Sequence, residues 1–175
     1  MKTITRSNIY LPMAAMILTA ALAVPAAAQK LVPFEGAIRQ GQDVDIAGGP
    51  PPVTVVVAAS GTGTGALLGQ FSFTQVITVN FANNTSTGSG QWIAANGDSI
   101  YTTVFGAGAS VTGDFITITE INTVTGGTGR FTGAQGSFTV ELFHKLEPSG
   151  VAGGVETHDI FGSFHGTITS PGAAK

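Results

Sequence analysis

The segment Thr125–Phe138 constrains the fold of this chain more than any other, because it places five glycines in fourteen residues directly before an alternating strand. Glycine adopts positive φ at little cost and lets two backbones approach closely. In the strand that follows, Phe138, Val140, Leu142 and His144 share one register. The segment therefore predicts a tight corner in a curved sheet and not a flexible tail.

The rest of the chain is typical of an all-β protein. In residues 71–81, Phe71, Phe73 and Ile77 share one face, and Gln75 is the polar exception in that apolar register. This two-residue period indicates a half-buried strand. Further strands are expected at 31–38, 53–59, 91–95, 99–105, 114–124, 138–146 and 155–169.

Short turns join most of these strands, and Asn96-Gly97-Asp98 predicts a hairpin turn of type I′. Strands that are neighbours in sequence then pair with one another. The fold predicted is an eight-stranded antiparallel meander β-barrel, because closure removes the exposed sheet edges. A barrel of this size has room for side chains or for one small ligand.

The N-terminus has the features of a secretory signal peptide over residues 1–28. Lys2 and Arg6 precede an apolar run, and Ala26-Ala27-Ala28 offers a cleavage site before Gln29. The alternative, an uncleaved anchor, conflicts with an apolar run shorter than the ~20 residues of a membrane span. We therefore expect a bacterial protein that is secreted or periplasmic, with no membrane span after cleavage.

The mature chain is expected to form one domain. Residues 29–52 are an N-terminal strand and an irregular linker, residues 53–169 form the barrel with 31–38 as an added strand, and residues 170–175 are a disordered tail. Removal of Lys2 and Arg6 leaves five basic residues (7 − 2) against ten acidic ones. This acidic balance argues against a nucleic-acid partner.

The sequence offers no signature of a metal or cofactor site. The chain has no cysteine, which excludes disulfides, thiol catalysis and cysteine zinc sites. His144, His158 and His165 lie on strands, but no HxH or HExxH motif occurs, and Asp43 and Asp45 are expected in a loop without calcium spacing. We therefore expect no metal and no cofactor.

Two segments carry a resemblance to a known family. Trp92–Ile100, and Thr125–Phe138 with the close at Gly166-Thr167-Ile168, resemble the allene oxide cyclase barrel-like superfamily, which includes the plant dirigent proteins. The resemblance implies an eight-stranded barrel, often trimeric, with an apolar cavity. It also implies binding of small hydrophobic molecules and cofactor-free cyclisation or radical coupling. No catalytic set of that superfamily maps onto this chain by motif.

Glu120 is the candidate catalytic residue, because it shares a register with Ile116 and Ile118. If that face points inward, burial raises the pKa of the carboxyl and suits it to general acid–base work. If Glu120 lies at the barrel rim, it is an ordinary solvated carboxylate.

Five further residues are candidates for ligand contacts. Gln75 either orients a ligand or satisfies a nearby backbone group, since a buried amide needs a partner. Trp92 and Tyr101 either line a pocket or pack in the core. Arg130 either meets an anionic ligand or bonds turn carbonyls, and His144 shares the inward register of Leu142.

Two functions fit these observations. The first is an exported barrel that binds a hydrophobic small molecule, as a binding or dirigent-like stereocontrol protein or as a cofactor-free cyclase or isomerase. The second is a non-enzymatic structural or surface-interaction protein whose barrel is filled by its own phenylalanines, of which the chain has eleven. Under either function Phe143 points outward and is available to a neighbouring copy, and a trimer is expected by analogy with the superfamily.

Overall fold

The computed structural model describes residues 30–48, 54–152 and 155–169. The expected signal peptide, most of the 48–52 linker and the 170–175 tail lie outside these residues. The strands are β1 (Leu31–Gly48), β2 (Thr54–Gly65), β3 (Gly69–Asn80), β4 (Thr85–Ala94), β5 (Ser99–Thr112), β6 (Phe115–Gly127), β7 (Gly136–Lys145), β8 (Gly150–Ala152) and β9 (Val155–Thr169).

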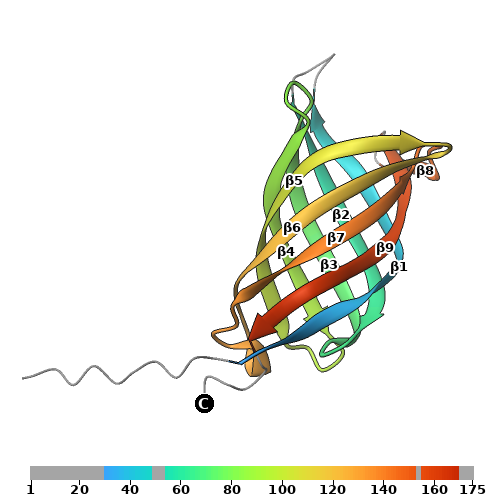
Figure 1. The fold of residues 1–175 in the computed structure, drawn as a ribbon. Coiled ribbons are helices and arrows are strands. Elements are labelled where there is room, and N and C mark those ends of the chain that lie inside the picture. The colour runs from blue at the N-terminus through green and yellow to red at the C-terminus, as the bar shows by residue number, and fades with distance from the viewer. Residues whose placement is uncertain (1–29, 49–53, 153–154, 170–175) are drawn as a thin grey trace, which may run out of the picture.

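The chain forms a closed eight-stranded antiparallel meander barrel, as the sequence predicts (Figure 1). Strands β1 to β7 pair in sequence order, β9 pairs with β7, and β1 closes the barrel by pairing with β9. The short strand β8 pairs with the start of β9 outside this cycle. A single 3-10 turn, Gly129–Phe131, is the helical element of the described residues. None of those residues form a helix long and apolar enough to cross a membrane.

Strand β1 is longer than its sequence pattern predicts. It runs from Leu31 to Gly48 and pairs with both β2 and β9, so residues 39–48 belong to the barrel. Asp43 and Asp45 therefore lie on a strand and not in the expected loop. Residues 39–45 carry few apolar side chains, and pairing on both sides overrides this weak strand signal.

The turn at Asn96-Gly97-Asp98 also differs from expectation. Among the described residues, Leu67 and Asn84 are the non-glycine residues with positive φ, whereas Gly97 has φ +86°. A type I′ turn needs positive φ at both central residues, so the type I′ prediction is wrong. The side chain of Asn96 instead accepts a bond from the backbone N–H of Asp98.

Aromatic rings fill one end of the barrel. Phe34, Phe71, Trp92, Phe138 and Phe164 are buried there, with neighbouring ring centroids 4.8–5.7 Å apart. We call this the filled end. Glycines on β1 and β2 make room for the rings. A Cβ on Gly36 would lie 2.6 Å from Cζ of Phe164, and one on Gly63 would lie 2.6 Å from Cζ of Phe71.

The glycine-rich segment is the tight corner that the sequence predicts, and it closes the filled end (Figure 1). Gly129 has φ +54°, and a Cβ there would collide with the carboxylate of Asp98. Gly136 has φ +126°, and a Cβ there would lie 2.3 Å from the carbonyl oxygen of Thr167. Both positions therefore require glycine, one for a turn and one for close strand packing.

Candidate functional site

The other end of the barrel contains a cavity of about 260 Å³. Aliphatic side chains line its walls and are smaller than the rings of the filled end. Exposed residues such as Asp45 and Phe81 line it at the end of the barrel, which we call the mouth. The wall side chains are Val55, Val57, Ala59, Ile77, Val79, Ile116, Ile118, Leu142 and Ile160.

Glu120 lies inside the barrel and lines this cavity. Its side chain is only 2% exposed, so of the two sequence alternatives the inward one is confirmed and the rim position is not. Burial raises the pKa of the Glu120 carboxyl from 4.5 to about 7. Its Oε2 atom has no hydrogen-bond partner. An unpartnered buried carboxyl next to empty space is suited to receive a polar group of a ligand.

Glycine on the neighbouring strand makes this position possible. Glu120 on β6 pairs with Gly106 on β5, and a Cβ on Gly106 would lie 3.5 Å from Cγ of Glu120 and 2.3 Å from Oγ of Ser86. A larger residue at position 106 would compete with both side chains for the cavity.

A buried polar layer separates the cavity from the filled end. Nε2 of Gln75 donates to Oδ1 of Asn122 at 3.2 Å, and Oγ1 of Thr102 donates to the same oxygen at 2.9 Å. Gly90 lies between Gln75 and Thr102 on the paired strands and leaves room for these contacts. Gln75 therefore bonds a side chain, a partner that the sequence analysis does not anticipate.

A histidine–aspartate pair lies in the cavity wall near the mouth. Nδ1 of His144 on β7 lies 2.7 Å from Oδ2 of Asp43 on β1. The ring of His158 on β9 stacks on that of His144, with centroids 4.5 Å apart, and its Nδ1 lies 3.0 Å from the carbonyl oxygen of Lys145. All three side chains line the cavity. Among the described residues, no group of three or more His, Asp or Glu is arranged to hold a metal ion.

The structure places the other predicted ligand contacts outside this cavity. Trp92 is fully buried among the rings of the filled end. Tyr101 is 40% exposed, and its backbone carbonyl accepts a bond from Thr125. Neither side chain lines the cavity.

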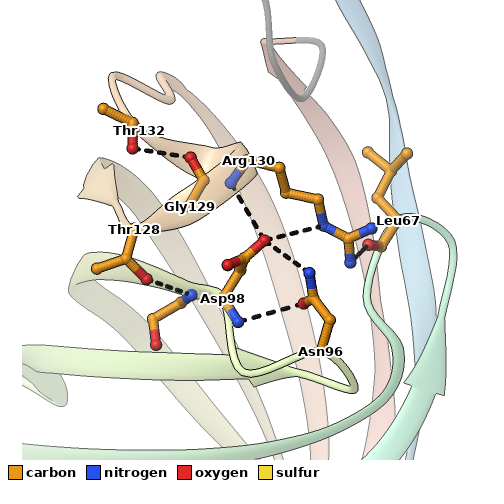
Figure 2. Close-up of polar contacts among 8 residues, drawn as sticks. Leu67, Asn96, Asp98, Thr128, Gly129, Arg130 and Thr132 are labelled. Carbon is orange, nitrogen blue, oxygen red and sulfur yellow. Dashed lines mark hydrogen bonds and ion pairs between the residues drawn. The ribbon is translucent and has the colours of Figure 1, made fainter.

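Arg130 acts in the corner and not at the cavity, as Figure 2 shows. Its Nη2 donates to the carbonyl oxygen of Leu67 at 2.5 Å, and its backbone N–H donates to the carboxylate of Asp98 at 3.1 Å. Asn96 also donates to Asp98, at 2.7 Å. The backbone N–H of Arg130 is the main cause that lowers the pKa of Asp98, followed by the Asn96 side chain. These contacts join three turns at the filled end.

The sequence analysis missed several residues of the site. Asn122 lies two residues after Glu120 in the same register, so the alternation could have identified it. Asp43 and His158 could not be found in this way, because Asp43 lies 101 residues from its partner His144. His158, which the sequence places on a strand without a role, lines the cavity.

The fold and this site define a class of protein: a small closed β-barrel, filled at one end, with an apolar cavity and a buried carboxyl at the other. No protein-family model matches the chain. No curated protein matches it either.

Among solved structures, the chain is similar to that of the pterocarpan synthase dirigent protein GePTS1. The similarity covers 92% of this chain and 99% of that chain, at 12% identity and a TM-score of 0.43.

Proposed function

We propose that this protein binds a small, largely apolar molecule in its cavity and that Glu120 acts on that molecule as an acid–base group. Such a protein would be a cofactor-free isomerase or cyclase, or would steer a reaction by holding one conformer. Its setting would be outside the cytoplasm, secreted or periplasmic, as the signal-peptide pattern predicts.

One observation carries this proposal: Glu120 is buried in the cavity wall with an unpartnered oxygen and a pKa of about 7. A carboxyl with this pKa is present in both protonation states near neutral pH, so it can give or take a proton. The surrounding aliphatic walls favour an apolar ligand. The cavity, at about 260 Å³, lies just below the range of about 300–1,000 Å³ that is typical of small-molecule pockets, so it suits a small ligand.

Binding is tested by titrating decanol into the protein by calorimetry. The wild type should bind one molecule, and Val57→Phe, which fills the cavity, should bind at least tenfold more weakly. Val76→Phe is the matched control, since Val76 lies on the outer face at 50% exposure and should leave binding unchanged. Equal binding by the wild type and Val57→Phe, or no binding by the wild type, would contradict the proposal.

The acid–base role is tested on whichever molecule co-purifies with the protein in native mass spectrometry. Glu120→Gln keeps the size and hydrogen bonding of the side chain but cannot carry a proton, so it should retain the molecule and lose turnover by about 100-fold or more. Glu141→Gln is the control, since Glu141 is exposed on β7. Unchanged turnover in Glu120→Gln would refute the acid–base role and leave a binding protein.

A second candidate function, contact between copies of this chain, is favoured by an aromatic cluster on the outer face. Phe143 and Phe161 stack with ring centroids 5.4 Å apart and are 38% and 41% exposed, and Phe115 packs against Phe161 at 5.6 Å. Phe143 therefore points outward, as the sequence predicts. Contiguous exposed apolar surface of this kind is typical of interaction sites.

The assembly is tested by sedimentation velocity. If the aromatic cluster is an interface, the wild type should sediment as an oligomer, a trimer by analogy with the superfamily, and Phe161→Ser should sediment as a monomer. Val111→Ser, at a more exposed apolar site on β5, should not change the assembly. A monomeric wild type would overturn this second candidate.

A further inference from the structure

The cavity has polar groups at two places that are separated along the strands. Glu120 on β6 pairs with Val140, whereas His144 on the same strand as Val140 pairs with Ile116. Glu120 and His144 thus differ by four residues in register, which is roughly 13 Å along the strands at 3.3–3.4 Å per residue. Ile118 and Leu142 form the wall between them.

At the mouth, the geometry determines which nitrogens remain for a ligand. Nδ1 of His158 faces a carbonyl oxygen, which only accepts, and Nδ1 of His144 faces the carboxylate of Asp43. Both Nδ1 atoms therefore carry the hydrogen. In a neutral imidazole with its hydrogen on Nδ1, the Nε2 atom is then left as an acceptor.

The charges of the residues that line the cavity also favour a ligand with a neutral hydrogen-bond donor. Asp43, Asp45 and Glu120 line the cavity, and none of the described residues that line it is a Lys or Arg. An anionic end group would meet carboxylates and imidazole lone pairs with no cation to pair with. A hydroxyl can donate to one of the mouth acceptors, and it fits Glu120 in either protonation state because it both donates and accepts.

We infer that the ligand is an elongated apolar molecule with a hydroxyl group at each end, one bonded to Glu120 and the other to the imidazole of His144 at the mouth. This inference rests on the proposed function, since it names the class of molecule that the same cavity takes. It gives His144 and Asp43 a defined part: Asp43 orients the ring, and the ring receives the outer hydroxyl.

The test compares linear alcohols with linear diols of the same chain length, from hexane to dodecane, by calorimetry on the full chain. For the mono-alcohols, affinity should rise steadily with length as more apolar surface is buried. For the diols, it should pass through an optimum at which both ends reach their partners. At that optimum the diol should bind about fivefold to tenfold tighter than the matched mono-alcohol, the worth of about one added hydrogen bond. Dodecanoate should bind more weakly than dodecanol.

Variants of His144 test whether this residue binds the outer hydroxyl of the ligand. His144→Phe keeps a ring in the wall and should remove the advantage of the diol over the matched mono-alcohol, whereas His165→Phe, an exposed control on β9, should keep that advantage. His144→Gln keeps a donor for Asp43 if the Phe variant does not fold, and it should shift the optimum or lower the advantage.

The outcomes separate this inference from the function on which it rests. Wild-type binding of mono-alcohols with no diol advantage at any length would overturn the two-ended ligand and leave the proposed function standing. Tighter binding of dodecanoate than of dodecanol would also overturn it. Failure of the wild type to bind any of these probes would overturn both.

Discussion

The two ends of the barrel are built from the same eight strands but have opposite interiors. At the filled end, Trp92 and the phenylalanine rings around Phe164 contact one another and glycines on β1 and β2. At the mouth end, aliphatic side chains of the same strands leave a cavity of about 260 Å³. The difference teaches that inward residue size, and not strand number, decides which part of a small barrel is core and which part is a site.

The polar groups follow the opposite arrangement. Asp98 and Arg130 lie in the corner outside the filled end, where they join turns. Glu120 lies inside the other end, without a partner for Oε2. The filled end therefore contributes stability through both its interior and its surface, and the open end holds a group whose burial costs stability.

Substitutions in the two interiors should give the largest difference in stability between the two ends. Phe164→Ala removes a ring that contacts four others and should lower the free energy of unfolding by about 3–5 kcal/mol. Ile118→Ala in the cavity wall should cost less than half as much, because part of its surface already faces empty space. Urea unfolding of the two variants measures both values, and equal losses would show that the two ends do not differ in packing.

The next largest effect concerns the pH dependence of stability. The folded pKa of Glu120, about 7, lies above its ordinary 4.5, so between these values the folded state holds a proton that the unfolded chain has lost. The contribution of Glu120 to stability is therefore fully present below pH 4.5 and is lost as pH rises to about 7, by on the order of 3 kcal/mol. Glu120→Gln has no such loss.

Chemical unfolding at a series of pH values tests whether stability falls as pH rises. The stability of Glu120→Gln relative to the wild type should increase between pH 4.5 and 7 and then level off. Glu141→Gln, at an exposed position, should run parallel to the wild type. Parallel curves for Glu120→Gln would mean that the buried carboxyl does not have a raised pKa.

The polar layer at the boundary should give a smaller effect. Gln75→Leu removes one bond to Asn122 together with the unpartnered Oε1 of Gln75, so gain and loss nearly cancel. We expect a change in the free energy of unfolding within about 1 kcal/mol, with Thr102 still donating to Asn122. A much larger loss in thermal or urea unfolding would show that this layer holds the two ends together.

The smallest effect is expected at the corner, and it has the opposite pH sign. The lowered pKa of Asp98 stabilises the fold at pH values above its ordinary 3.8 and is lost as pH falls through the folded pKa. The small stability advantage of the wild type over Asp98→Asn should therefore disappear on acidification. Asp114→Asn serves as the exposed control, and an advantage that persists at low pH would contradict the assignment.

The sequence predicts the fold better than the site, and particular residues show why. Alternation around Phe71 and Glu120 identifies strands and their inward faces, and the glycine corner indicates closure. The division of the barrel interior into core and cavity cannot be predicted in this way, because it depends on contacts between strands that are distant in sequence. Trp92 and Glu120 both point inward, yet only their heights along the barrel place one in the core and the other in the cavity. The pairing of Asp43 with His144 also depends on closure of the barrel, because β1 and β7 come close to each other by pairing with the two sides of β9.

The pairing of Leu31 with Thr169 has a practical consequence. Strand β1 begins and β9 ends beside each other at the filled end, as Figure 1 shows, and the mouth lies at the far end of both strands. A fusion partner, or a linker to a sensor surface, joined at either strand terminus would therefore leave the entrance facing the solution. The protein can be immobilised from either side of the sequence in one common orientation, with its cavity accessible to added molecules.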